Sequence, residues 1–572
     1  MSTSQLTMTG EINAKSQEAG LITYQAFQEM VKDPMKYQQE LLFKLLEDNK
    51  DTEYGKKYGF SEITSIKEFQ EKLPITKFDN YAEYITRMTQ HGESNLITVY
   101  PVNHYNRSAG TMGTPKCIPV SDPAAQLFFK YSRNYFDGMI ADKIGSEWIN
   151  GKNVSIVECF DAIDTLPCGA SSGAVSAKMM LDARPYWGLL VTSPDEAVFP
   201  QASTFTRYLH ARFAIMEQNV AQLSSSFSSY LYELMRYIEN NWELLVSDIA
   251  NGTISESISL HPNARKTLME RIKPMPERAA QLREIFEQGF EKPIATKIWP
   301  NLTFIVAVGT GVFQSYMDKL RTRYVGEEVP CYYLGLTASE GTFSVPFQLS
   351  NPSSVLIPES MFFEFLPVDA EDDFSKVLTI DQLEQGGMYE VIITNLSGFY
   401  RYRMGDVMRV VGMHHSTPIM EYVQRLDNAV SMMCEKTSET AIRFAAEETA
   451  KELGFELAGF SMYPDSDSVP SCYQYFLEIS HMPKIINPKI IRLCLEKNLV
   501  KANPVAGQVM KNGMLGTPRV NFLEKDSYNL YADLMIFKGA PPSQIKPVTV
   551  IHNEVQRKFF FGRTEYSSIK MQ

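Results

Sequence analysis

The sequence lacks any long apolar run. None of its stretches reaches the length of a transmembrane helix, and the polar segment 1–20 has no apolar core of the kind that a signal peptide carries. Clusters of lysine and arginine are also absent, and the net charge is −12. Nonspecific nucleic-acid binding needs clustered positive charge, so the sequence argues against nucleic-acid and membrane partners alike.

Cysteine is scarce as well. The seven cysteines are scattered, their number is odd, and no two of them have CxxC spacing. A disulfide framework or a zinc site uses cysteines that recur in pairs at characteristic spacings. We therefore expect reduced thiols and a cytoplasmic protein.

What is abundant is core-forming material. The chain has 572 residues, of which 44% are hydrophobic and 12% aromatic, enough for more than one core. Leucines recur at helical spacing in residues 37–47, and apolar residues do so again in residues 228–248. Short β-branched runs at 154–157, 303–308 and 391–394 predict buried strands between such helices. The sequence therefore predicts an α/β fold.

One run carries the clearest chemical signal. Residues 108–116 read SAGTMGTPK, which places small, hydroxyl-bearing and flexible residues before a lysine. Glycines allow close approach of the backbone to an anion, and hydroxyls, N–H groups and an ammonium then bind it. The run does not fit the P-loop pattern, because Gly and Lys are not adjacent and no Ser or Thr follows Lys116. It predicts a polyphosphate-binding loop, with an ordinary polar turn as the alternative.

Three further segments accompany this run: TASE at 337–340, YRMGD at 402–406, and RLD at 425–427. Together the four segments resemble the core motifs of the adenylate-forming enzymes, whose loop reads close to SSGTTGxPK and whose second motif is YRxGD. The segments GFYRYRMGDVMRV, CEKTSE and PSQIKPV are similar to one branch, the acyl-acid amido synthetases first known as auxin-responsive Gretchen Hagen proteins. The resemblance spans almost the whole chain.

The resemblance implies a fold and an activity. We expect a large N-terminal adenylation domain over 1–425, with β-sheets covered by helices, and a smaller mobile α+β domain over 426–572. The enzyme would use ATP and Mg²⁺ to activate a small carboxylic acid as an acyl-adenylate. It would then transfer the acyl group to an amine, such as an amino acid.

The resemblance also implies roles for single residues in the phosphate-binding run. Ser108, Thr111 and Lys116 would contact the phosphates, while Gly110 and Gly113 would allow close backbone approach. The sequence departs from the superfamily pattern at Ala109 and Met112, which each lack a usual hydroxyl. The set of phosphate contacts is therefore expected to differ from the usual one.

In the TASE segment the resemblance implies that Glu340 binds Mg²⁺ beside the phosphates. Thr337 and Ser339 would lie beside the nucleotide. Leu336 stands where the family usually has a tyrosine, so a ring stacked on adenine is either missing or supplied by Tyr333.

The remaining implied site residues come from the later segments. Asp406 would accept hydrogen bonds from the ribose hydroxyls. Arg425 falls at the interdomain hinge of the superfamily and is counted among the nucleotide contacts, whereas Arg403 is equally suited to a structural ion pair. Lys436 and Lys546 match catalytic lysines of the smaller domain.

Two other motifs compete with this interpretation. Residues 169–173 read GASSG and fit the G-x-S-x-G elbow of serine hydrolases, although Pro167 interrupts the strand that an elbow needs and no histidine is assignable as its base. Gly309-Thr310-Gly311 begins like a dinucleotide fingerprint but lacks its last glycine.

Two alternatives to the amido synthetase stay open: a ligase that forms a thioester with coenzyme A, and a catalytically silent nucleotide-binding homologue. The acid pocket is expected within residues 120–190 and 305–345, where no pattern specifies the acid. The amine and the oligomeric state are not predicted.

Overall fold

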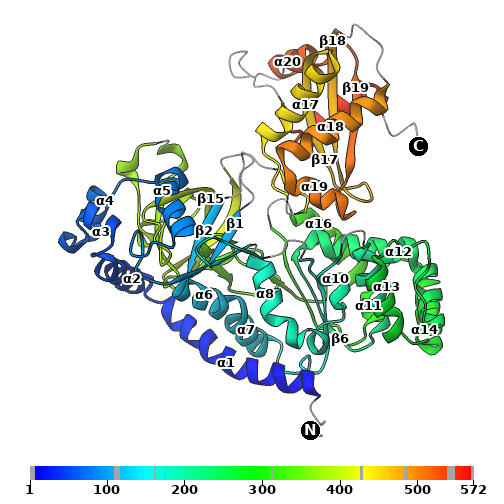
Figure 1. Ribbon diagram of the computed structural model, residues 1–572, viewed down its shortest axis with the longest axis horizontal. Helices are drawn as coiled ribbons and strands as arrows, with labels where there is room; N and C mark the ends of the chain where they lie inside the picture. The colour runs from blue at the N-terminus through cyan, green and yellow to red at the C-terminus, as the bar shows by residue number, and fades with distance from the viewer. Residues whose placement is uncertain are drawn as a thin grey trace. The chain divides into compact units, whose positions relative to one another are not determined.

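The computed structural model of the protein describes residues 7–108, 116–159, 163–173, 175–201, 204–310, 313–370, 372–425, 430–433, 435–481, 487–537 and 548–567. These residues form two compact units, the first reaching residue 425 and the second starting at residue 430. Helices and β-sheets pack together in both units, which confirms the predicted α/β class (Figure 1). Within the described residues, no helix is long and apolar enough to cross a membrane.

A parallel sheet forms one core of the first unit. Its strands, in the order of pairing, are β3 (Lys152–Ile156), β6 (Val220–Phe227), β7 (Phe304–Val308) and β8 (Cys331–Tyr333). The apolar run that supplies β7 is buried over its first four residues, as expected for a strand covered on both faces. Helix α12 (Ser228–Asn251) buries Leu231, Leu234 and Ile238 along one face and ends at Gly252, whose φ is +64°.

Two more sheets of at least four strands belong to the first unit. A mixed sheet contains, in order, β2 (Lys116–Ser121), β1 (Val102–Ser108), β5 (Ser171–Gly173) and β4 (Asp164–Thr165). An antiparallel sheet contains, in order, β11 (Ser344–Pro346), β12 (Ser354–Leu356), β16 (Thr417–Arg425), β15 (Tyr402–His414), β14 (Met388–Asn395) and β13 (Met361–Pro367). Seven of the eight residues of β14 are buried, and its adjacent residues Val391 and Ile392 belong to two different core clusters.

Helices of the first unit lie around these sheets. They include α1 (Met8–Met30), α2 (Pro34–Asn49), α3 (Glu53–Tyr58), α4 (Ile66–Lys72), α5 (Ala82–Thr86), α6 (Asp122–Phe129), α7 (Tyr135–Lys143), α8 (Val175–Ala183), α9 (Trp187–Leu190), α10 (Asp195–Val198), α11 (Thr206–Met216), α13 (Pro262–Arg271), α14 (Pro276–Phe286), α15 (Ala295–Ile298) and α16 (Gln314–Leu320). The predicted helix over 37–47 is the central part of α2, which begins after the Asp33 cap.

Helices α1 and α7 lie side by side at the edge of the first unit (Figure 1). Their backbones meet at Gly20 and Gly138, where a Cβ atom on Gly138 would lie 2.1 Å from the carbonyl oxygen of Gly20. No side chain fits at that distance, so the crossing requires glycine. Along the same contact, Phe27 stacks edge-on against Tyr135 with 4.9 Å between the ring centroids.

The second unit has one sheet with helices against it. Its strands, in order, are β17 (Glu456–Asp465), β18 (Cys472–His481), β19 (Gly516–Leu523) and β20 (Thr564–Ser567). Its helices include α17 (Glu439–Leu453), α18 (Pro488–Ala502), α19 (Pro504–Lys511), α20 (Ser527–Phe537) and α21 (Glu554–Gly562). Ser438 caps the first turn of α17 through its hydroxyl, and Gly454 follows the helix with φ +72°.

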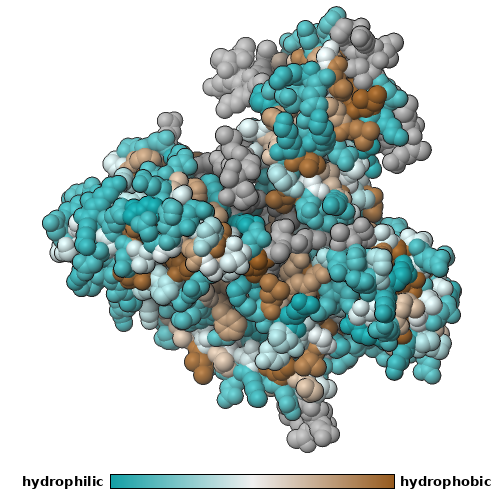
Figure 2. Space-filling model, in the orientation of Figure 1, coloured by the Kyte–Doolittle hydropathy of each residue, from teal (hydrophilic) through white to brown (hydrophobic). Residues whose placement is uncertain are grey.

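Most of the surface on the face drawn in Figure 2 is hydrophilic, and the hydrophobic residues there form small separate groups. The six described cysteines form no disulfide. Neither feature indicates a functional site, so we turn to the polar side chains of the predicted motifs.

Candidate nucleotide site

Strands β1 and β2 flank the predicted phosphate-binding run. They pair antiparallel, and their last pair joins Ser108 to Lys116, so both ends of the run start from one end of a ladder. The intervening residues, which include Gly110, Thr111 and Gly113, lie outside the described residues. Lys116 is half-buried, with its Nζ atom 5.2 Å from the centroid of the Phe78 ring, a cation–π contact that holds the ammonium at this end of β2.

Glu340 lies in the turn of a very short hairpin. Strand β9 (Thr337–Ala338) pairs with β10 (Gly341–Thr342), which leaves Ser339 and Glu340 as the two turn residues. Both turn residues are half-buried, and Thr337 is exposed. A two-stranded hairpin of this length is not stable by itself, so its position must come from contacts with its surroundings.

Two asparagines make those contacts. The Nδ2 atom of Asn106, on β1, donates to the carbonyl oxygen of Ser339 at 2.8 Å. The Nδ2 atom of Asn395, the last residue of β14, donates to the carbonyl oxygen of Glu340 at 3.0 Å. Consecutive carbonyls of the turn are thereby bound from two different sheets. The strand that ends at Ser108, the turn with Glu340, and the end of β14 meet at one place.

Asn395 also organises the turn that precedes the strand of Asp406. The Oδ1 atom of Asn395 accepts the backbone N–H groups of Ser397 and Phe399 at 3.0 and 3.1 Å, and so forms the turn from β14 into β15. Gly405 in β15 has φ +84°, a conformation that favours glycine, and the pairing of β15 with β16 shifts register after Val407. Asp406 lies between Gly405 and this shift and is buried.

Arg425 pairs with Asp406 through the backbones of β16 and β15. Arg403 forms the structural ion pairs that were one of its two expected roles. Its Nε atom lies 2.7 Å from Glu390 and its guanidinium 2.7 Å from Asp372. The pKa of Arg403 is raised above its ordinary value, chiefly by its hydrogen bonds to the Glu390 carboxylate.

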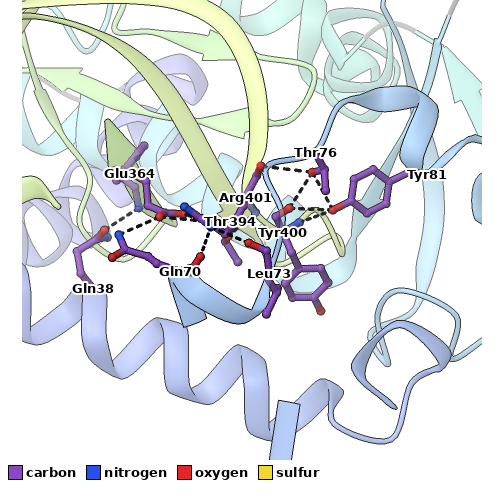
Figure 3. A network of polar contacts seen from close by, with 10 residues as sticks. Gln38, Gln70, Leu73, Thr76, Tyr81, Glu364, Thr394, Tyr400 and Arg401 are labelled. Carbon is purple, nitrogen blue, oxygen red and sulfur yellow. Dashed lines mark hydrogen bonds and ion pairs between the residues drawn. The ribbon is translucent and has the colours of Figure 1, made fainter. Parts of the chain in front are cut away.

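A second network holds the beginning of this strand region (Figure 3). Arg401 has φ +47°, and its Nε atom lies 3.1 Å from the buried Glu364 carboxylate. The Arg401 guanidinium also donates to the carbonyl oxygens of Gln70 and Leu73 at 2.5 and 2.6 Å, next to α4. Thr76 donates to the carbonyl oxygen of Tyr400 at 2.8 Å. The N-terminal helices are thus fastened to the segment that leads to Asp406.

In the second unit, Lys436 is exposed and has φ +43°, in the left-handed region. The neighbouring Glu435 is fully buried. Its carboxylate accepts the N–H groups of Met432 and Met433 at 2.8 and 2.9 Å and the hydroxyl of Tyr473. A buried acid therefore folds this loop and turns Lys436 outward. Lys546 lies outside the described residues.

The expected adenine platform is not at Tyr333. This residue ends β8 and is buried in the core beside Gly309, where a Cβ would lie 2.8 Å from the Tyr333 ring. Burial raises the pKa of its hydroxyl to about 12. Leu336 is half-buried against the other core of the unit. Gly309 therefore has a packing role, and the weak dinucleotide motif is not needed to explain it.

The GASSG segment does not form a hydrolase elbow. A histidine does contact it, since His104 Nδ1 lies 2.8 Å from the Ser171 hydroxyl, a contact that sequence reasoning missed. However, Ser171 begins strand β5, whereas an elbow serine sits at the turn that follows a strand. The Ser171 hydroxyl also donates to the carbonyl oxygen of Asn103 at 3.2 Å.

Three of the segments that carry the predicted motifs, the strand ending at Ser108, the hairpin 337–342 and the strands β14 and β15, thus lie in the first unit. Comparisons with known proteins then identify the branch. Three family models match the chain. The GH3 family N-terminal domain matches residues 23–330, the GH3 family central domain matches residues 354–425, and the GH3 family C-terminal domain matches residues 440–555. The chain belongs to the GH3 family, which confirms the resemblance read from the motifs.

The relatives are named amide-forming synthetases. A jasmonoyl–L-amino acid synthetase, JAR6 of Nicotiana attenuata, is 26% identical over 540 residues, with 91% of each chain covered. An indole-3-acetic acid-amido synthetase, GH3.2 of Arabidopsis thaliana, is 27% identical, with 82% of this chain and 88% of that protein covered. The solved structure of the AtGH3.15 acyl acid amido synthetase in complex with 2,4-DB has the same fold. Its TM-score is 0.64 at 21% identity, with 96% of this chain and 97% of that chain covered.

Proposed function

We propose that this protein is an ATP- and Mg²⁺-dependent acyl-acid amido synthetase that joins a small carboxylic acid to an amino acid. The observation that carries the proposal is the pair of asparagine bonds that brings the end of β1, the Glu340 turn and the end of β14 together. The first two segments carry the phosphate and cation motifs, and the turn after β14 leads to the strand with the ribose motif. Membership of a family whose named relatives conjugate acids to amino acids supports the second half of the proposal.

The first step joins two anions. A carboxylate oxygen of the acid attacks the α-phosphorus of ATP, the bond to the β-phosphate oxygen breaks, and pyrophosphate leaves. Ser108, Thr111 and Lys116, with Gly110 and Gly113, hold the phosphates, and the Lys116 ammonium offsets their charge. Asp406 accepts the ribose hydroxyls, and Thr337, Ser339 and Arg425 border the nucleotide.

Glu340 is suited to Mg²⁺. Among the described residues, no three His, Cys, Asp or Glu side chains gather into a cage for a metal ion. This agrees with the way proteins bind Mg²⁺ together with a nucleotide, through one or two carboxylates and the substrate phosphates. The half-buried turn holds one carboxylate beside the strand that leads to Ser108, which supports this assignment. When bound, the cation neutralises phosphate charge.

The second step forms the amide. A neutral amine attacks the acyl carbon, the bond from that carbon to the AMP oxygen breaks, and the amine loses a proton to water. We assign Lys436 and Lys546, in the domain 426–572, to the catalytic set that serves the two steps. The hinge at Arg425 lets that domain take a different orientation for each step. The domain 1–425 holds the ATP and acid sites. The described cysteines form no disulfide, which supports a cytoplasmic location.

A catalytically silent homologue is the second candidate, because Leu336 replaces the usual tyrosine and Tyr333 does not take its place. Acid-dependent exchange of pyrophosphate into ATP decides between the two. The purified full chain, incubated with ATP, Mg²⁺ and a broad panel of acids, should exchange with at least one acid, and Lys116→Ala should not. No exchange with any acid would support the silent homologue.

The product identifies the acceptor. With the active acid, amino acids and coenzyme A offered separately, mass spectrometry should find an amide together with AMP. A thioester formed without any amide would overturn the amido synthetase and favour a coenzyme A ligase.

A further inference from the structure

We propose that Asn106 and Asn395 are positioning residues that set the Ser339–Glu340 turn, and through it the Glu340 carboxylate, for a nucleotide-bound cation. The inference rests on the proposed function. It goes beyond that function because both asparagines lie outside the four motifs that predicted the site. Neither is expected to touch the nucleotide, since each acts on the backbone of the turn.

The two asparagines that bind the turn come from two different sheets. Asn106 belongs to the mixed sheet and Asn395 to the antiparallel sheet, and they bind the carbonyl oxygens of neighbouring residues at 2.8 and 3.0 Å. Both are deeply buried, with 5% and 3% of their surface exposed. Two fixed carbonyls determine the direction of the peptide between Ser339 and Glu340. The Cα–Cβ bond of Glu340 is then fixed as well, which leaves its side chain few directions.

The two carboxamides are used differently. Asn395 uses its oxygen as well as its nitrogen, because its Oδ1 atom organises the turn of Ser397 and Phe399. Among the described residues, the buried Oδ1 atom of Asn106 makes no hydrogen bond of ordinary geometry, although the Asn106 side chain interacts with the His104 ring and opposes the lowering of that ring's pKa by burial. A buried unpaired oxygen destabilises a fold, and asparagine is depleted in strands. Stability therefore does not explain Asn106, whereas the single bond from its Nδ2 atom to Ser339 does.

The bonds also connect the motifs. Asn106 lies two residues before Ser108, the last described residue ahead of the phosphate-binding run. Asn395 forms the turn that leads to the YRMGD strand. A shift of either strand is therefore passed to Glu340. Residues around the ligands of a metal commonly control its affinity in this way.

The test uses substitutions that remove the donated bonds. Asn106→Ala deletes an amide whose oxygen makes no ordinary hydrogen bond among the described residues, so the fold should persist. Asn395→Asp keeps the oxygen that accepts Ser397 and Phe399 and loses the N–H donor to Glu340, but it also adds a negative charge beside the turn, so Asn106→Ala is the cleaner variant. The matched control is Asn13→Ala. Asn13 is equally buried and donates to the carbonyl oxygen of Ile149 at 2.8 Å, on helix α1.

Titration calorimetry should measure ATP binding to the full chain with and without Mg²⁺, and thermal unfolding should be followed for each variant. We expect Asn106→Ala and Asn395→Asp to weaken Mg²⁺-dependent ATP binding by about 10- to 100-fold. Binding of ATP without Mg²⁺ should stay unchanged, and Asn13→Ala should bind like wild type under both conditions. Because both asparagines hold one turn, the double variant should lose less than the product of the single losses.

Positioning is overturned if the wild type shows Mg²⁺-dependent binding and the two variants match Asn13→Ala. It is also overturned if both variants lose ATP binding equally with and without Mg²⁺, which is the result of a merely structural role. A wild type that binds no ATP in the presence of Mg²⁺ would instead overturn the proposed function, and the positioning role with it. Should Asn395→Asp unfold, Asn106→Ala alone decides.

Discussion

Two buried polar networks in the first unit differ in how completely they are paired. Around Arg401, no buried nitrogen or oxygen of the side chains of Gln38, Gln70, Glu364 and Arg401 lacks a partner in the described part of the chain (Figure 3). Around the Ser339–Glu340 turn, Asn106 Oδ1 and Thr342 Oγ1 are buried and make no ordinary hydrogen bond to any residue that the structure describes.

We interpret the fully paired Arg401 network as structural framework and the incompletely paired network around the turn as part of the candidate site. A fully paired network, once formed, holds its segments in one arrangement. An incompletely paired network lowers stability, and natural proteins keep such groups mainly where something else depends on them. We therefore expect substitutions in the first network to lower the free energy of unfolding. Substitutions in the second should lower ligand binding and turnover.

The strongest test of the framework network is Glu364→Ala. This change leaves the Arg401 guanidinium, only 4% exposed, without its carboxylate. The free energy of unfolding should fall by about 3–5 kcal/mol, because an uncompensated charge stays buried. Guanidinium chloride unfolding followed by circular dichroism measures it. The double variant Glu364→Leu, Arg401→Met should recover most of the loss, and a single variant as stable as wild type would break the comparison.

Glu340→Gln probes the turn with a change that removes the charge and keeps the shape of the side chain. The side chain is half-buried and lies in a turn, so the free energy of unfolding should change by no more than about 0.5 kcal/mol. Acid-dependent pyrophosphate exchange should fall by about 100-fold or more, because the charge that balances the cation is lost. If stability fell as much as in Glu364→Ala, the two networks would not differ in the way described.

A third buried group sharpens the comparison through pH. Glu158 accepts a hydrogen bond from Thr206, and His210 Nε2 lies 3.7 Å from Glu158 Oε1, but Glu158 Oε2 and His210 Nε2 make no hydrogen bond within the described ranges of the chain. Burial raises the pKa of Glu158 from 4.5 to about 7 and lowers the pKa of His210 from 6.5 to about 3. Stability linked to Glu158 is thus complete below its ordinary pKa of 4.5 and lost as pH rises through about 7. Stability linked to His210 is present above 6.5 and lost as pH falls through about 3.

Glu158→Gln removes the first of these terms. Relative to wild type, the variant should become progressively more stable as pH rises from about 5 to about 8. Denaturant unfolding at several pH values in this window provides the measurement. A difference between the two proteins that stays constant over the window would mean that the carboxyl group titrates at its ordinary pKa in the folded protein.

The smallest effect is expected at the edge of the framework. Asp372 is 73% exposed and pairs with Arg403, which is also held by the buried Glu390. Asp372→Asn should change the free energy of unfolding by less than about 1 kcal/mol, since water screens an exposed pair. Glu390→Gln should cost clearly more in the same unfolding assay. Equal losses would show that burial does not set the strength of these ion pairs.

The sequence predicted the elements well where one pattern acts locally. The helix over 228–248 and the strand over 303–308 follow from apolar spacing alone, and both form with ends shifted by only a few residues. The motif strings led to the family because they are nearly continuous in sequence. The roles of the residues in them stay predictions, and Lys546 with the middle of the phosphate-binding run lies outside the described residues.

The asparagine contacts could not be predicted in the same way. A carboxamide carries no indication of which carbonyl it will face, and Asn106 binds a residue 233 positions away. One signal was present: two asparagines, Asn103 and Asn106, occur within one short strand, where asparagine is disfavoured. Tyr333 shows the opposite failure, because a ring near the right sequence position packs into the core.

The most direct test of the account is to locate a bound nucleotide. A crystal structure of the full chain with ATP and Mg²⁺ should place the phosphates between the Ser108–Lys116 run and Glu340, with the ribose hydroxyls at Asp406. A nucleotide bound elsewhere, or one that reaches only one of these three segments, would contradict the claim that they form a single site.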